Sequence, residues 1–170
     1  MFLKIKNIPS VSWSSEKPLN FKPKISTFFF LCFGLTLFGL GEGLLIVSAS
    51  GASPWSVLAQ GLYLNLGFSV GVITIFISFI VLLLWIPLKQ KIGIGTILNA
   101  LIIGLMIDVC IRYWETPENY MDKSLLGAVA VAIVGLGGGI YLVANLGAGP
   151  RDGLMIGLQK KTNLPIALVR

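Results

Sequence analysis

Charged residues within apolar sequence are the first candidates for chemistry in this chain. Glu42 interrupts an apolar run over 25–47, and a carboxylate inside a membrane span costs about 3 kcal/mol on insertion scales. Arg151 and Asp152 follow Pro150 directly, in the first turn of an expected short helix. Because a helix N-terminus attracts anions, Asp152 is stabilised there, and Arg151 predicts a site for an anionic group of a solute.

Three further polar or aromatic residues belong to the same hypothesis, and each candidate has a structural alternative. Glu42 is near the end of its helix, where solvent or backbone groups can satisfy it. Arg151 can instead bind lipid phosphate or pair with Asp152, and Asn99 can bond a neighbouring helix. The candidate substrate-binding residues are Glu42, Trp55, Ser56, Asn99, Arg151 and Asp152. Asp108 and Arg112, four residues apart, are expected to neutralise one another.

The elements that must position these residues occur twice. Residues 39–62 recur as 135–158, shifted by 96 positions, with eleven of 24 aligned residues identical. This similarity predicts an internal duplication. Each copy contains a Gly-x-x-Pro break followed by a short helix, with Ser53 as an N-cap in the first. The helix-break residues are Gly51, Ser53 and Pro54 in the first copy and Gly147, Gly149, Pro150 and Gly153 in the second.

Composition excludes most soluble classes. Apolar residues make up 55% of the chain and charged residues 12%, with a mean hydropathy of +0.88. We therefore expect an all-α, polytopic membrane helix bundle. The net charge of +6 does not indicate nucleic acid, because the positive residues cluster at one expected face. With no His and two separated Cys, we expect no disulfide, metal site, cofactor or catalytic residue, and an enzyme is the least favoured class.

The chain divides into a tail and two unequal repeats. Residues 1–24 form a basic cytoplasmic tail, 25–124 the first repeat and 125–170 an incomplete second repeat. The expected spans are 25–47, 68–88, 94–114 and 125–146, the short helices are 54–66 and 150–162, and a further span begins at the end of the chain. By comparison with the first repeat, about 36 residues of the second are missing, so we expect a fragment or a chain completed by another copy.

Orientation follows from the positive-inside rule. A cytoplasmic N-terminus places eleven of thirteen Lys and Arg inside, with Arg112 and Lys123 outside. An odd number of spans then separates the starts of the repeats, so they have opposite topology, as in many transporters. Each inverted repeat contains one short interfacial or re-entrant helix. The alternative is a compact bundle in which the glycines serve helix packing alone.

Three segments resemble a known family: residues 39–62, residues 92–110 and above all LGAGPRDGLMIGLQKKTNLPIALVR at the end of the chain. They are similar to the YczE/YyaS/YitT-like group of bacterial integral membrane proteins, and most similar to the YczE type. The Gly-Pro-Arg-Asp-Gly element at 149–153 is the most specific part. The resemblance implies a multi-pass protein of the cytoplasmic membrane, and it implies no molecular activity.

Inverted repeats with broken helices favour a transporter that moves a small solute. Two alternatives stay open: an aquaporin-like channel, although the Asn-Pro-Ala signature is absent, and a membrane scaffold or regulator that assists another enzyme system. The expected partners are the lipid bilayer and a small-molecule solute, with a homodimer as a further candidate and no nucleic acid. The expected location is the bacterial cytoplasmic membrane.

Overall fold

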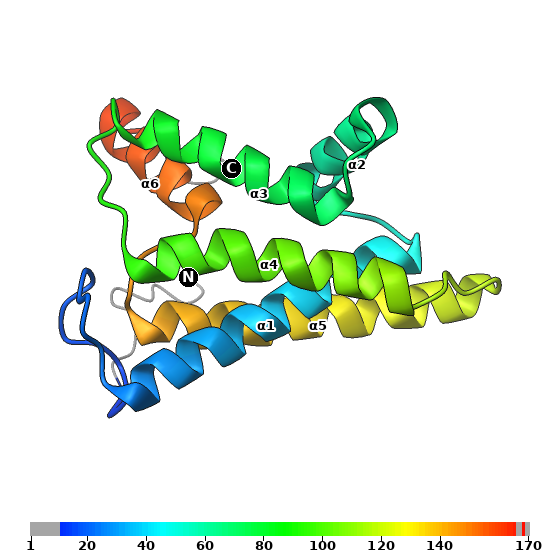
Figure 1. Ribbon diagram of the computed structural model, residues 1–170, viewed down its shortest axis with the longest axis horizontal. Helices are drawn as coiled ribbons and strands as arrows, with labels where there is room; N and C mark the ends of the chain where they lie inside the picture. The colour runs from blue at the N-terminus through cyan, green and yellow to red at the C-terminus, as the bar shows by residue number, and fades with distance from the viewer. Residues whose placement is uncertain (1–10, 166–167, 169–170) are drawn as a thin grey trace.

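The computed structural model describes residues 11–165 and 168, and within them all regular structure is helical (Figure 1). The elements are α1 (Ile25–Ser48), α2 (Pro54–Leu66), α3 (Val70–Trp85), α4 (Ile94–Tyr113), α5 (Tyr120–Ala144) and α6 (Pro150–Thr162). The expected start of a further span lies largely outside the described residues, as does the first part of the basic tail. The all-α class is confirmed.

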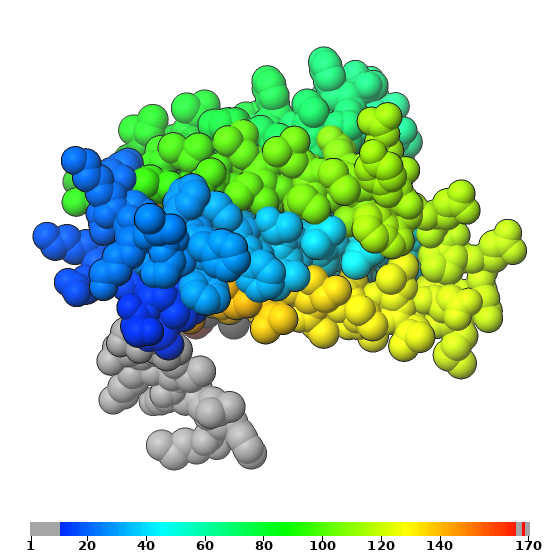
Figure 2. Space-filling model, turned by 60° about the horizontal axis from the view of Figure 1, so that its bottom comes forward, coloured from blue at the N-terminus to red at the C-terminus, as the bar shows by residue number. Residues whose placement is uncertain are grey.

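Helix α1 lies between α4 and α5 and packs on both, while one side of α1 stays exposed (Figures 1 and 2). Glycines allow this approach. A Cβ placed on Gly34 would lie 2.7 Å from the backbone nitrogen of Tyr141, and one on Gly41 would lie 2.9 Å from the carbonyl oxygen of Ala130. As the residue number rises on α1 it falls on α5, so the two helices are antiparallel and their backbones meet with little side chain between them.

The backbone of the break recurs along with its sequence. Helices α2 and α6 both have 13 residues and begin with Pro at equivalent positions, over the ranges expected from the sequence. The preceding helices both end on a left-handed residue, Ala49 (φ 51°) and Asn145 (φ 55°). Gly51 and Gly147 then have φ of 158° and 117°. A left-handed residue ends a helix by satisfying its last carbonyls, so the same local signals stop α1 and α5.

Two helices differ from the sequence-based expectation. The span expected over 68–88 is α3, with only 16 residues or about 24 Å. The Ser69 side chain caps its start, and after Trp85 the chain makes a tight turn that contains Pro87, which has no N–H to continue the helix. The helix direction bends by 114° between α2 and α3. Conversely, α5 begins at Tyr120, before the span expected over 125–146, because Asn119 caps the Met121 N–H.

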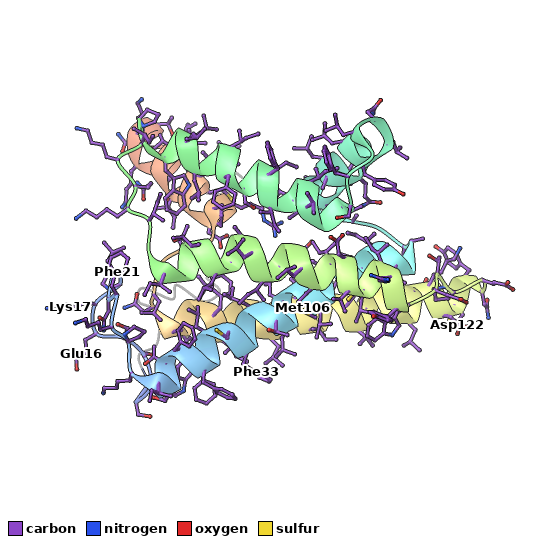
Figure 3. The ribbon with its side chains drawn as sticks, viewed as in Figure 1. Glu16, Lys17, Phe21, Phe33, Met106 and Asp122 are labelled. Atoms are coloured by element: carbon purple, nitrogen blue, oxygen red, sulfur yellow. The ribbon has the colours of Figure 1, made fainter. Side chains whose placement is uncertain are left out.

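The outward faces of the helices are apolar, while charges gather at the two ends of the bundle. Phe33 on α1 points away from the bundle, and Lys17 and Asp122 lie at opposite ends (Figure 3). Three helices (α1, α4 and α5) are long and apolar enough to cross a membrane, and the bent pair α2–α3 allows a fourth crossing. Water would solvate such faces poorly, whereas lipid tails suit them. The protein is therefore an integral membrane protein.

Candidate functional site

The Glu42 carboxylate is the centre of a polar cluster inside the bundle. Its side chain comes from α1 and the residue is 4% exposed. Oε2 accepts a hydrogen bond of 2.7 Å from the Ser56 hydroxyl and one of 3.2 Å from the Ser53 hydroxyl. Both serines belong to the start of α2, where the Ser53 oxygen also caps the Ser56 N–H. The N-terminus of α2 therefore receives a carboxylate from within the protein.

Arg151 reaches the same carboxylate from the start of α6. Its Nη1 lies 3.6 Å from the Glu42 Oε1, and its guanidinium carbon lies 5.8 Å from the centre of the Phe38 ring. Three quarters of the Arg151 side chain is buried. Among the described residues, its charged partner is Glu42 and not Asp152, so the structure does not show the alternative in which Arg151 pairs with its neighbour Asp152. The first turns of the two short helices thus converge on one buried carboxylate.

Asp152 and Pro150 fix the start of α6 against its neighbours. The Tyr141 hydroxyl of α5 donates a hydrogen bond to the Asp152 carboxylate. The Trp85 indole N–H donates to the Pro150 carbonyl at 3.0 Å, and the Trp85 ring fills the space beside Gly153, where a Cβ would lie only 1.9 Å from it. Gly153 is therefore required by packing, and the aromatic residues of α3 and α5 hold α6 in place.

Asn99 of α4 lies against the start of α6 and is 7% exposed. A Cβ placed on Gly149 would be 2.9 Å from the Asn99 amide nitrogen. Within the described part of the chain, the Asn99 side chain makes no hydrogen bond to protein, although the residue lines a cavity of about 920 Å³. A buried amide that opens into a cavity keeps its donors and acceptor for another molecule.

The structure brings the six candidate residues together. Five of them line the cavity, namely Glu42, Trp55, Asn99, Arg151 and Asp152, and Ser56 bonds Glu42 directly. Pro54, Gly51 and Gly149 contribute to the same wall. Two members were not foreseen: Tyr141, which bonds Asp152, and Phe38, which lies beside Arg151. Neither stands out in a sequence where aromatic residues are frequent.

Asp108 has a different role from the one expected. Its carboxylate accepts hydrogen bonds from the Ser69 hydroxyl at 2.5 Å and from the Gly71 N–H at 2.7 Å, so it stabilises the start of α3. No ion pair with Arg112 occurs among the described residues, and the expected neutralisation is wrong. The backbone approach of α3 and α4 at Gly71 and Gly104 brings Asp108 within reach.

The apolar helices and the internal polar cluster define a polytopic α-helical membrane protein. More specifically, the chain belongs to the family of unknown function DUF6198, which it matches over residues 25–170. The predicted resemblance to the YczE and YyaS group is confirmed by the relatives below.

A Haemophilus influenzae relative described as an uncharacterized protein is 35% identical over 167 residues, covering 98% of this chain and 76% of the relative. The uncharacterized membrane protein YczE of Bacillus subtilis is 34% identical over 146 residues, covering 85% and 67%. The uncharacterized protein YyaS of the same organism is 31% identical over 139 residues, covering 77% and 69%. No solved structure matches the chain.

Proposed function

We propose that this protein is a transporter that moves a small solute across the cytoplasmic membrane and binds it where α2 and α6 meet. One observation carries the proposal: Ser56 and Arg151, from the first turns of two separate short helices, both contact the buried Glu42 beside a cavity. Transporters commonly bind their solutes between interrupted helices near the middle of the membrane. A purely structural bundle has no need of a charged cluster in that place.

The proposal includes an inverted-repeat architecture. The contacts between α1 and α5 are reciprocal: Gly34 meets Gly137, the equivalent of Gly41, while Gly41 meets Ala130, the equivalent of Gly34. Reciprocal contacts of this kind are the signature of a two-fold axis. Because α1 and α5 are antiparallel, such an axis lies in the membrane plane, and α2 and α6 become re-entrant helices that enter from opposite sides.

The charges support a cytoplasmic N-terminus. Lys17 lies at one end of the bundle and Asp122 at the other (Figure 3). The segment before α1 and the start of α4 both lie at the end of α5, since the Ser15 N–H donates to the Ala144 carbonyl and the Gly95 N–H to the Leu146 carbonyl. Lys89 and Lys91 lead into the start of α4, and the turn that contains Lys89 packs on α6 at Gly157, so these lysines and the last turn of α6 belong to the same end as the start of α1. Positive residues collect on the cytoplasmic side of membrane proteins. An impermeant thiol reagent added to intact cells should label Glu118→Cys and spare Lys89→Cys; the reverse pattern contradicts the orientation and the inverted repeat built on it.

The donors at the start of α6 favour a solute with an anionic group. Arg151 has five N–H donors and a single carboxylate contact at 3.6 Å, and the Asn99 amide opens into the cavity. The N-cap of α6 is Gly149, which supplies no side chain to the first-turn N–H groups. Glu42 holds Arg151 in the absence of solute, and an incoming carboxylate or phosphate group replaces it. An aquaporin-like channel is the second candidate, because two short helices that meet end to end also occur in such pores.

Uptake into liposomes tests the proposal. The purified protein, reconstituted in liposomes, should accumulate radiolabelled anions by counterflow, screened with carboxylates first and phosphate second. Arg151→Ala and Arg151→Lys should both abolish uptake, because Lys lacks the planar fork that binds a carboxylate through two bonds. Arg112→Lys, at the exposed end of α4, is the matched control and should retain uptake.

The possible outcomes separate the alternatives. Uptake that survives in Arg151→Lys removes Arg151 from the site. Swelling of liposomes in polyol solution without counterflow indicates a channel. Absence of any solute movement contradicts the proposal and leaves a scaffold or regulator, which fits Glu42 and Arg151 as a structural ion pair.

A further inference from the structure

One face of the second repeat lacks the helices that cover the same face of the first. On α1, a Cβ placed on Gly39 would lie 2.8 Å from the Met106 Cβ of α4, and one on Gly43 would lie 2.6 Å from the Cys110 Cβ. The equivalent residues on α5 are Gly135 and Gly139. Neither has any neighbour within 4 Å of such a Cβ among the described residues. A glycine pair that admits a close helix in one repeat is open in the other.

The short helices show the same difference. On α6, Gly153 is buried under the Trp85 ring, and Gly157 lies against Leu88, with 3.0 Å between its Cβ position and the Leu88 Cβ. Their equivalents on α2 are Val57, which is 57% exposed, and Gly61, which has no described neighbour within 4 Å. The end of α3 therefore covers α6, and none of the described helices covers the corresponding surface of α2. Both open surfaces correspond to surfaces covered by α3 and α4.

We propose that the face formed by Gly135 and Gly139 of α5 and by Val57 and Gly61 of α2 receives a second antiparallel pair of apolar helices, built like α3 and α4 and following α6 in the same polypeptide. The reciprocal contacts of α1 and α5 place such a pair there, since the two-fold operation that exchanges α1 with α5 moves α3 and α4 onto this face. Gly135 and Gly139 also line the cavity of about 920 Å³ described above, so the added pair would close that cavity on one side and leave the Glu42 and Arg151 side as its remaining wall. The inference does not depend on whether any solute moves.

The relatives are long enough to contain such a pair of helices in addition to the matched region. The 146 matched residues cover 67% of YczE, and the 167 matched residues cover 76% of the Haemophilus influenzae relative, so each has a substantial further segment. A second copy of the described helices fits the face less well. Its α3 and α4 are already packed on one another at Gly71 and Gly104, and the α4 surface that fits a glycine pair is buried on its own α1. The proposed additional helices must therefore have an α4-like surface that is not already buried on another helix.

A chimera tests the proposal with a disulfide. Gly67 and Asn163 are the equivalent C-caps of α2 and α6, so a second copy of residues 68–114 is joined directly after Asn163. Cys32 and the first copy's Cys110 are replaced by Ala. Gly139→Cys then faces the Cys110 of the added copy, just as Gly43 faces Cys110 in the first repeat, where the two Cβ positions lie 2.6 Å apart. The two helices must separate by about 1 Å to reach the Cβ–Cβ distance of a disulfide. We expect mild oxidation to give an intramolecular disulfide in more than half of the chains.

One control variant checks the register of the added helices, and two outcomes would overturn the proposal. Gly135→Cys faces the added Met106 instead of a thiol and should stay unlinked. A chimera that purifies as a monodisperse monomer, yet leaves Gly139→Cys unlinked, overturns the proposal. So does efficient intermolecular linkage of Gly139→Cys to Gly139→Cys in the chain without the added helices, because a second copy then occupies the face. Protection of Gly61→Cys from a membrane-permeant maleimide in the chimera alone gives independent support.

Discussion

The starts of α2 and α6 have the same backbone and different chemistry. At α2, Ser53 caps the helix with its own side chain, and Ser56 donates to Glu42. At α6, Gly149 provides no side-chain cap, and Arg151 carries a guanidinium where the first copy has the Trp55 indole. At the start of α2, the polar groups named above find their hydrogen-bond partners within the first repeat. The second depends on Glu42 and Tyr141 and retains free donors.

The two helix breaks share their backbone and differ in their side chains, so the backbone is the structural part of the break and the side chains are its variable part. The Gly-x-x-Pro backbone stops one helix and starts another in both halves, so it is common structure. The residues at positions 55 and 56 and at 151 and 152 have diverged, and they decide what each helix end can bind. The proposed solute would therefore meet the Arg151 guanidinium at the α6 end, whereas the α2 end is closed by the Glu42 carboxylate.

The largest effect is expected from removing the carboxylate that joins the two helix starts. Glu42→Ala leaves Arg151 without its ion pair and removes the carboxylate to which the Ser53 and Ser56 hydroxyls donate. It should lower the free energy of unfolding by about 3 kcal/mol. Because a quarter of Arg151 is exposed, this value is at the lower end for a buried pair. Thermal unfolding in detergent measures it. The double variant Glu42→Gln/Arg151→Met should recover part of the loss, and an unchanged melting temperature for Glu42→Ala contradicts the buried pair.

A smaller loss is expected at the N-cap of α6. Gly149→Ala places a methyl group 2.9 Å from the Asn99 amide and should cost about 2 kcal/mol through overpacking. The same thermal assay applies. The double variant Gly149→Ala/Asn99→Ala removes the opposing side chain and should restore most of the stability. If its loss of unfolding free energy equals the sum of the losses of the two single variants, the two residues do not touch.

At the N-cap of α2, the cost should be smaller again. Ser53→Ala removes both the cap of the Ser56 N–H and a weak bond to Glu42, for a loss of about 1 kcal/mol. Ser53→Asp keeps a cap acceptor but adds a second carboxylate beside Glu42, so it should be no better than Ser53→Ala. A fully stable Ser53→Asp contradicts the contact between the Ser53 side chain and the Glu42 carboxylate.

The smallest effect is a gain at the position equivalent to Glu42. Gly138→Ala replaces a helical glycine and places its Cβ 3.4 Å from the Phe38 ring, an ordinary contact, so it should stabilise the protein by about 0.5 kcal/mol. Gly137→Ala is the matched control. Its Cβ would lie 2.4 Å from the Phe38 backbone nitrogen, and it should destabilise. Equal melting temperatures for the two variants contradict the close seam between α1 and α5.

The two helix breaks could be predicted from local sequence signals. The partners of the polar side chains could not, because they depend on contacts between residues far apart in the sequence. Ser53, Pro54 and Pro150 mark helix starts in the sequence itself, and the structure begins α2 and α6 there. The partner of Arg151 could not be derived in this way, since Glu42 belongs to another repeat and reaches it only after the helices pack. Asp108 was misassigned for the same reason: a neighbour four residues away was visible in the sequence, whereas the start of α3 was not.

Under the proposed inverted repeat, the reciprocal contacts between α1 and α5 constrain how the chain arose. Two identical half-length proteins could form this seam only if one entered the membrane upside down relative to the other. An ancestral half would then have needed a lysine distribution that favoured neither orientation. Under the proposed inverted repeat, fusion of the halves would let the chain as a whole set their orientation. Lysines could then accumulate at one end, and the two copies could come to differ at Glu42 and Arg151.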